Sequence, residues 1–200
     1  MRLGIDFGTT RIIVAAVDRG NFPLLSFSTG DSTFDWFPSL IAIRGKERLY
    51  GWDAWEVQGD PSWTPIRSIK RFLENSGPHT VVDAGGEQIP LTELLAGLTG
   101  ALHQAIQAST ESGEPLQIML GVPANANSNQ RFLTADAFRR AGFEVLGLLN
   151  EPSAASIEFG HKQPPSTGVS NILVYDLGGG TFDASLVETR MFETPVEGGC

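Results

Sequence analysis

The sequence contains one cysteine in 200 residues, and this cysteine, Cys200, is the last residue. No disulfide can therefore form within these residues, a pattern that favours a cytoplasmic protein. No apolar run approaches the ~18 residues that a membrane span requires. Asp6 follows Arg2 closely and interrupts any signal-peptide core. The three histidines lie far apart and have no cysteine partners, which argues against a zinc site.

Basic residues are also scarce. The chain has 14 Lys and Arg residues against 23 Asp and Glu residues, and its formal net charge is −9. This charge argues against nucleic acid as the main partner. Because 41% of the residues are hydrophobic and 18% are charged, the composition predicts a soluble globular protein with a real core.

The most informative segment runs from Val174 to Leu186 and reads as a strand, an acid, three glycines, a threonine and a second strand. Glycines in such a turn bring backbone N–H groups close to a bound anion. Asp176 and Asp183 flank the turn, where two carboxylates would repel a bare phosphate. The pattern therefore predicts a divalent cation between these carboxylates and phosphate oxygens.

A related segment opens the chain at Leu3–Thr10, again a strand followed by Asp, Gly and Thr. Ordinary turns also use Gly and Asp, so this hairpin alone is weak evidence. Two such hairpins in one chain predict that both contact the phosphates of one nucleotide, from opposite sides.

Between the two hairpins, strand patterns come first and then helices alternate with strands. Four tryptophans crowd residues 36–63, where packing of a small subdomain is favoured over a stacking platform. This order predicts an α/β fold with a mixed sheet. Strands are expected near 2–28, 38–43, 116–122 and 143–149, and helices near 65–73, 91–109 and 127–141. Asn127 and Gln130 form a capping-box pattern at the start of the last of these helices.

Several segments match one family in order and spacing: Gly4-Ile-Asp-Phe-Gly-Thr-Thr10, Ile69-Lys-Arg-Phe72, Val122-Pro-Ala124 with Gln130-Arg131, Asn150-Glu-Pro-Ser-Ala-Ala155, and Asp176-Leu-Gly-Gly-Gly-Thr-Phe-Asp183. These segments resemble the DnaK-type heat-shock chaperones of the stress response. That family belongs to the ATPase superfamily shared with actin and sugar kinases.

The resemblance implies an actin-like, ribonuclease H-like ATPase lobe with a mixed five-stranded sheet flanked by helices. The core subdomain is expected at about residues 1–36 and 115–200, and a small inserted α/β subdomain at about 37–114. The resemblance reaches only the first lobe of the family's ATPase domain. A second lobe with the adenosine pocket and a substrate-binding domain are therefore expected in a longer protein, and ATP hydrolysis by the 200 residues alone is expected to be very weak or absent.

The resemblance further implies ATP or ADP, Mg²⁺ and K⁺ as ligands, with catalytic and metal-site roles for individual residues. Asp6 and Asp176 would hold the water shell of the metal, and Glu151 would bind a metal-bound water. Lys70 would reach the γ-phosphate, and Asp183 would orient the attacking water. Phosphate contacts would come from residues near the two turns, namely Gly8, Thr9, Thr10, Arg11, Gly178, Gly179, Gly180 and Thr181, of which Thr181 also stands where bacterial members autophosphorylate.

Unfolded polypeptides are the partners implied for the intact protein, together with a J-domain co-chaperone and a nucleotide-exchange factor. Pro123 and Arg131 match the family's relay between the nucleotide and substrate domains, and alternatively act as a strand end and an exposed helix residue. Two residues depart from the family pattern. Arg11 replaces a small polar residue or tyrosine, and either contacts phosphate or points away into a salt bridge. Gly147 replaces an arginine that docks the J-domain, which argues against a standard J-domain partnership.

Two other functions fit parts of the pattern. An actin-like filament protein also carries Glu-Pro and Gly-Gly-Gly-Thr segments, and a sugar kinase shares the N-terminal hairpin. Phe182 with Asp183, the segment around Lys70 and Val122-Pro-Ala124 favour the chaperone ATPase over both.

Overall fold

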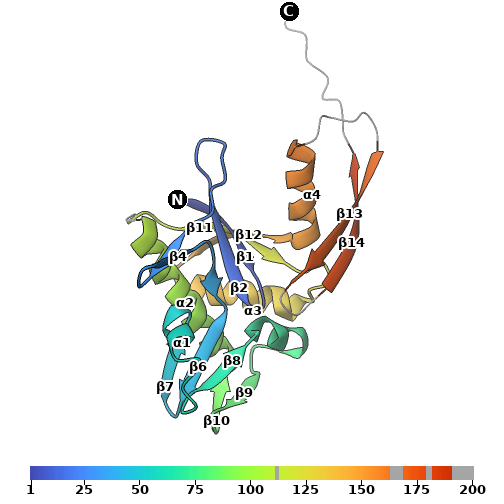
Figure 1. Ribbon diagram of the computed structural model, residues 1–200. Coiled ribbons are helices and arrows are strands. Elements are labelled where there is room, and N and C mark those ends of the chain that lie inside the picture. Colours follow the sequence, from blue (N-terminus) through green and yellow to red (C-terminus); the bar gives the residue numbers. More distant parts are fainter. Residues whose placement is uncertain (111–112, 163–168, 179–181, 191–200) are drawn as a thin grey trace, which may run out of the picture.

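A five-stranded mixed sheet forms the centre of the computed structural model, which describes residues 1–110, 113–162, 169–178 and 182–190 (Figure 1). In spatial order its strands are β12 (Glu144–Asn150), β11 (Gln117–Val122), β1 (Arg2–Phe7), β2 (Arg11–Ala16) and β5 (Phe37–Pro38). β1, β11 and β12 run parallel, whereas β1–β2 and β2–β5 are antiparallel. The predicted mixed sheet is confirmed.

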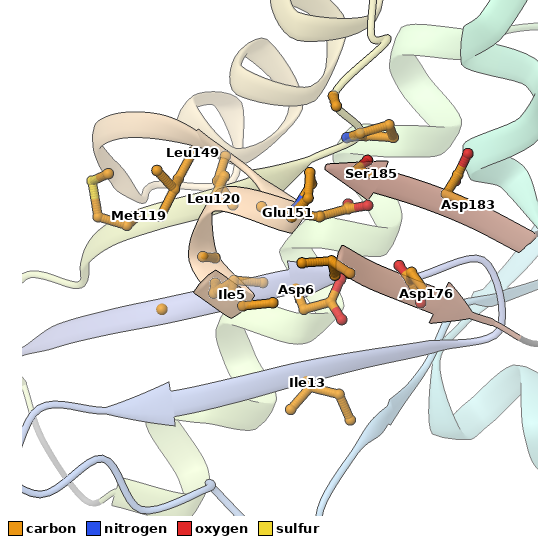
Figure 2. Close-up of a pocket in the computed structure, with 18 of the residues that line it drawn as sticks. Ile5, Asp6, Ile13, Met119, Leu120, Leu149, Glu151, Asp176, Asp183 and Ser185 are labelled. Carbon is orange, nitrogen blue, oxygen red and sulfur yellow. The ribbon is translucent and has the colours of Figure 1, made fainter. Parts of the chain in front are cut away.

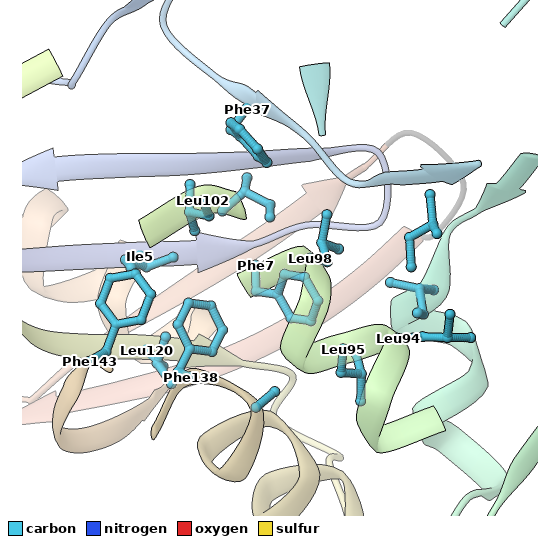
Figure 3. Packing of buried hydrophobic residues seen from close by; sticks show 14 of the residues in the cluster. Ile5, Phe7, Phe37, Leu94, Leu95, Leu98, Leu102, Leu120, Phe138 and Phe143 are labelled. Carbon is cyan, nitrogen blue, oxygen red and sulfur yellow. The ribbon is translucent and has the colours of Figure 1, made fainter. Parts of the chain in front are cut away.

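One face of this sheet is covered by α2 (Leu91–Thr110) and α3 (Ser128–Arg140). β1 alternates buried and exposed residues, so that Leu3, Ile5 and Phe7 point into this core while Asp6 points to the other face. Phe7 meets the ring of Phe138 edge-on at 5.8 Å between centroids (Figure 3). The alternation therefore decides which side chains reach the opposite face of the sheet.

The helix predictions for α2 and α3 are confirmed. α2 begins at Leu91, as its apolar spacing predicted, and α3 begins after a capping box. The side chain of Asn127 accepts from the backbone N–H of Gln130, whose own side chain accepts from the backbone N–H of Asn127. Gly142 follows the C-cap with φ of 95°, a conformation that glycine adopts without strain. No helix in the described ranges is long and apolar enough to cross a membrane.

A small α/β region follows β5 and is continuous with the main core. Its elements, with a preceding hairpin, are β3 (Phe27–Thr29), β4 (Ser32–Phe34), β6 (Leu40–Arg44), β7 (Glu47–Tyr50), α1 (Trp52–Glu56), β8 (Thr64–Arg67), the 3₁₀ helix η1 (Ile69–Asn75), β9 (Val81–Ala84) and β10 (Glu87–Pro90). Trp36, Trp52 and Trp55 pack on one another in this region, as the sequence predicted. The expected subdomain boundaries stay a prediction.

Two predicted elements are wrong in their extent. Residues 65–73 do not form one helix, because Thr64–Arg67 pairs with β6 as a strand and Ser68 then turns with φ of 59° into η1. Burial of Ile66 against β6 outweighs the helical pattern. Residues 38–43 are not one strand either, since the chain leaves the five-stranded sheet at Ser39 and enters a second sheet at Leu40.

The C-terminal part consists of α4 (Glu151–Lys162), β13 (Val169–Leu177) and β14 (Phe182–Arg190). β13 and β14 form an antiparallel two-stranded sheet of their own that lies beside α4 (Figure 1). Pro152 occupies the first turn of α4, where its missing N–H costs nothing. Because α4 begins directly after β12, its first residue lies at the carboxyl end of a central strand.

Candidate active site

The hairpins β1–β2 and β13–β14 have the same register. In each, four residues (8–11 and 178–181) separate the last paired residues, which are Phe7 with Ile12 and Leu177 with Phe182. One pair before the turn, Asp6 lies opposite Ile13 and Asp176 lies opposite Asp183. Asp6 and Asp176 therefore hold equivalent positions in the two hairpins.

A polar cavity of about 560 Å³ lies where these hairpins meet η1 and the start of α3. The residues that line it are Asp6, Gly8, Thr9, Thr10, Arg11, Ile13, Lys70, Arg71, Glu74, Pro123, Asn125, Asn127, Gln130, Glu151, Asp176, Gly178, Phe182 and Asp183. They come from both hairpins and from three further segments, so the fold gathers residues that are far apart in the sequence.

A partly buried ion pair lines this cavity. Lys70 Nζ donates to Glu151 Oε1 at 2.8 Å, and the two side chains are only 15% and 17% exposed. Lys70 comes from η1, and Glu151 is the first residue of α4, where its charge also favours the helix N-terminus. Gly121 lies against the Glu151 side chain, at ordinary van der Waals distance for an added Cβ. The pair holds the small α/β region against the carboxyl end of β12.

Excess negative charge surrounds this pair. Loss of hydration raises the pKa of Asp6 above its ordinary value, Lys70 opposes this rise, and Asp176 adds to it. Burial likewise raises the pKa of Glu151, again with Lys70 opposing and with Asp6 and Asp176 adding. Asp6 retains accessible surface, so protein atoms around the concave pocket, rather than complete enclosure, remove its hydration. Such a set of carboxylates is suited to a hydrated divalent cation.

The first turn brings its backbone close to itself. A Cβ added to Gly8 would lie 2.4 Å from the carbonyl oxygen of Arg11, a distance that no side chain tolerates. Glycine is therefore required here, and Thr9 beside it is buried. Thr10 accepts the backbone N–H of Ser39 at its carbonyl oxygen at 3.1 Å, which ties the turn to the chain after β5.

An apolar cavity of about 610 Å³ adjoins the polar one. Figure 2 shows residues that line the apolar cavity. It lies between β13–β14 and the face of the main sheet that α2 and α3 do not cover. Ile13 and Met119 line it from the main sheet, and Val174 lines it from β13. Asp6, Glu151, Asp176 and Asp183 line both cavities, so the carboxylates stand at their junction. A ligand with a charged end and an apolar end is compatible with this arrangement.

Comparison with known proteins identifies the family. The sequence model of the family described as Hsp70 protein matches residues 2–194, almost the whole chain. The chain belongs to the Hsp70 family. Its five-stranded mixed sheet with flanking helices is consistent with the actin-like ATPase lobe of Hsp70 proteins. Membership supports a chaperone ATPase-domain role in general, and Hsp70 proteins generally bind ATP or ADP with Mg²⁺.

The carboxylates of this Hsp70 chain fit Mg²⁺ held through water. Within the described ranges, no three His, Cys, Asp or Glu side chains converge closely enough to chelate an ion directly. Asp6, Asp176 and Glu151 nevertheless share one cavity, and their oxygens are the hard ligands that hydrated Mg²⁺ accepts. The donor set is therefore chemically compatible with a water-mediated metal site, and the role of each residue there stays a prediction.

The structure brings ten of the predicted site residues to the polar cavity, namely Asp6, Gly8, Thr9, Thr10, Arg11, Lys70, Glu151, Asp176, Gly178 and Asp183. Gly179, Gly180 and Thr181 lie outside the described residues. Sequence reasoning missed Asn125 and Glu74 as lining residues, and it assigned Asn127 and Gln130 to a helix cap, with Gln130 also part of a family segment. Asn127 also donates to the carbonyl oxygen of Glu74 at 3.1 Å, which no spacing rule signals.

Pro123 and Arg131 are placed differently from each other. Pro123 lines the polar cavity at the end of β11. Arg131 donates from Nε to the carbonyl oxygen of Ala126 at 3.1 Å and from Nη2 to Asn150 Oδ1 at 2.7 Å. Arg131 thereby links α3 to the residue before Glu151, and it is partly buried rather than exposed.

Proposed function

We propose that this chain grips the phosphates and Mg²⁺ of ATP between its two hairpins and hydrolyses ATP within a longer Hsp70 protein. One observation carries the proposal. Asp6 and Asp176, equivalent in register but 170 positions apart, line one cavity together with the Lys70–Glu151 pair. Two unrelated surface turns are not expected to place their carboxylates in one cavity. Phosphoryl transfer, by contrast, requires charge neutralisation and alignment of the reacting groups at one point.

Each side chain has a proposed task. Asp6 and Asp176 orient the water shell of the metal from opposite hairpins, and Glu151 accepts from a further metal-bound water. Mg²⁺, when bound, supplies positive charge against the phosphate oxygens. Gly8 permits the close backbone turn whose N–H groups face phosphate, and Thr10 adds a hydroxyl.

Lys70 and Asp183 are the proposed partners in the chemical step. Lys70 exchanges part of its contact with Glu151 for a γ-phosphate oxygen and neutralises charge as the transition state forms. Asp183 accepts a hydrogen bond from the attacking water, which forms a bond to the γ-phosphorus while the bond to the bridging oxygen breaks. ADP and inorganic phosphate leave, and the proton of the water departs by way of Asp183.

The finer biological assignment follows from the same proposal. In the cytoplasm, hydrolysis would be coupled to the binding of unfolded polypeptides by a separate domain. A nucleotide-exchange factor would reset the cycle, and a J-domain partner would stimulate it. Gly147 lacks the charge of the family's docking arginine, so J-domain stimulation is expected to be weak.

Replacement of Asp183 tests the proposed function. In the longer protein, Asp183→Asn should lower single-turnover ATP hydrolysis about 10²-fold while ATP binding persists, because an amide cannot take the proton of the attacking water. Asp53→Asn, a matched change at an exposed acid of α1, should leave hydrolysis unchanged. Equal hydrolysis by both variants would contradict the proposal.

A further inference from the structure

Arg11 makes an aromatic contact at the rim of the polar cavity. Its guanidinium carbon lies 4.8 Å from the centroid of the Trp36 ring. The contact follows from sheet pairing, because Arg11 begins β2 opposite Pro38 and Trp36 directly precedes β5. Arg11 also lines the cavity that Asp6 and Lys70 share. The stack therefore holds a positive charge beside the proposed phosphate site.

Other aromatic rings brace Trp36. Its ring centroid lies 5.2 Å from Phe34, 5.0 Å from Trp52 and 5.3 Å from Trp55, in tilted or edge-on contacts. Such contacts fix an aromatic ring more firmly than apolar burial alone. These contacts hold the Trp36 ring in place, and the Arg11 guanidinium packs on that ring.

The stack leaves the donors of Arg11 available. A guanidinium uses its face against an aromatic ring, while its five N–H groups point outward in its plane. No carboxylate among the described residues forms an ion pair with Arg11, and Asp35, the acid that precedes Trp36, accepts a hydrogen bond from Ser26 at 2.8 Å. Lys70, by contrast, already pairs with Glu151. A planar fork with free donors is suited to bidentate contact with phosphate.

We propose that Trp36 is a positioning residue that holds Arg11 at the cavity rim as a phosphate-binding group. The proposal rests on the proposed function, because it requires phosphate in the cavity. Trp36 then acts only through Arg11. Of the two alternatives for Arg11, phosphate contact or a salt bridge, the proposal takes the first, with an aromatic stack in place of the salt bridge. Binding of polyphosphate, rather than hydrolysis, reports this role directly.

The test is titration of the 200-residue chain with magnesium tripolyphosphate, which contains the phosphate chain without adenosine. Arg11→Gln should weaken binding roughly tenfold, the loss expected for one charge-assisted contact. Trp36→Leu should weaken it roughly threefold, because the guanidinium is still present but no longer held. Trp36→Tyr, which keeps an aromatic face, should restore most of the affinity. Trp63→Leu is the matched control, since Trp63 stacks with Arg44 at 4.3 Å and neither residue lines the cavity.

A double variant separates positioning from folding. In the Arg11→Gln background, Trp36→Leu should cost no further affinity, because nothing remains for the ring to position. An additional loss there, or equal effects of Trp36→Leu and Trp63→Leu, would overturn the role of Trp36. If Lys70→Ala weakens binding but Arg11→Gln does not, the inference fails while the phosphate site stands. If the unaltered chain binds no tripolyphosphate at millimolar concentration, the inference and the proposed function both fail.

Discussion

The two hairpins share a register but differ in what covers the face opposite the carboxylates. In β1–β2 that face is buried, and in β13–β14 its equivalents are exposed. The equivalent pairs are Leu3 at 2% and Leu173 at 52% exposure, Phe7 at 1% and Leu177 at 81%, and Ile12 at 0% and Phe182 at 61%. The same strand pattern therefore meets two different environments in one molecule.

This difference separates the site from the core. In both hairpins the aspartate points toward the cavities, so the site does not depend on burial of the opposite face. The second hairpin nevertheless places large apolar residues on that face. The ring of Tyr175 stacks on that of Phe182, with 6.2 Å between the ring centroids. An exposed apolar surface of this kind is typical of an unpartnered interface. We propose that the second lobe expected from the family resemblance covers it.

The largest expected effect concerns the positive charge of Lys70, which lines the cavity shared by the two hairpins. In the longer protein, Lys70→Ala should lower single-turnover ATP hydrolysis by about 10²–10⁴-fold while nucleotide binding persists, because a positioned charge is lost at the transition state. Rapid mixing with one equivalent of ATP measures the rate. An unchanged rate would show that Lys70 only ties η1 to Glu151.

The second prediction addresses the buried and exposed faces directly. Leu3→Ala should lower the free energy of unfolding by about 2–5 kcal/mol, because it opens a cavity in the core. Leu173→Ala, at the equivalent position of β13, should change it by less than about 0.5 kcal/mol. Urea unfolding of the 200-residue chain gives both values.

The same pair of variants sharpens the comparison in a longer chain. If the second lobe covers β13–β14, Leu173→Ala should become costly there while the effect of Leu3→Ala stays the same. A cost for Leu173→Ala that is already large in the 200-residue chain would mean that the hairpin is buried without a second lobe.

The third prediction concerns the metal. Asp176→Asn should weaken ATP binding about 10–100-fold in the presence of Mg²⁺, the range for loss of an outer metal contact, and much less without Mg²⁺. Titration of ATP with and without Mg²⁺ measures the difference. Equal losses in both conditions would point to a folding defect of the second hairpin rather than to a lost metal contact.

The smallest expected effect is the pH dependence of stability. Burial raises the folded pKa of Asp6 above its ordinary value of 3.8, so ionised Asp6 destabilises the fold above the raised pKa. Asp6→Asn should therefore raise the melting temperature at pH 7, and this gain should fade as the pH falls through the raised pKa toward the ordinary value.

Asp60 has a lowered pKa, in contrast to Asp6, and the same measurement of melting temperature against pH tests it. Hydrogen bonds from Ser62 lower the pKa of this exposed carboxyl, so Asp60→Asn should slightly lower the melting temperature at pH 7. A melting temperature of Asp6→Asn that lies below that of the unaltered chain at pH 7 would contradict the account of Asp6.

Local patterns predicted much of the fold, and packing decided the rest. The apolar spacing of 91–109 and the capping residues Asn127 and Gln130 located two helices, because both signals act within one element. Residues 65–73 were misjudged because burial of Ile66 against β6 overrides local helical preference. Motifs located the carboxylates of the site, whereas the stack of Arg11 on Trp36 depends on pairing of distant strands.

The central claim is that two equivalent hairpins grip one phosphate chain while the adenosine contacts lie elsewhere. Isothermal titration of the 200-residue chain with magnesium ATP, magnesium tripolyphosphate and adenosine tests it most directly. We predict weak and similar affinities for ATP and tripolyphosphate and no detectable binding of adenosine. Sub-micromolar affinity for ATP, or measurable binding of adenosine alone, would place an adenosine site within residues 1–200 and contradict the account.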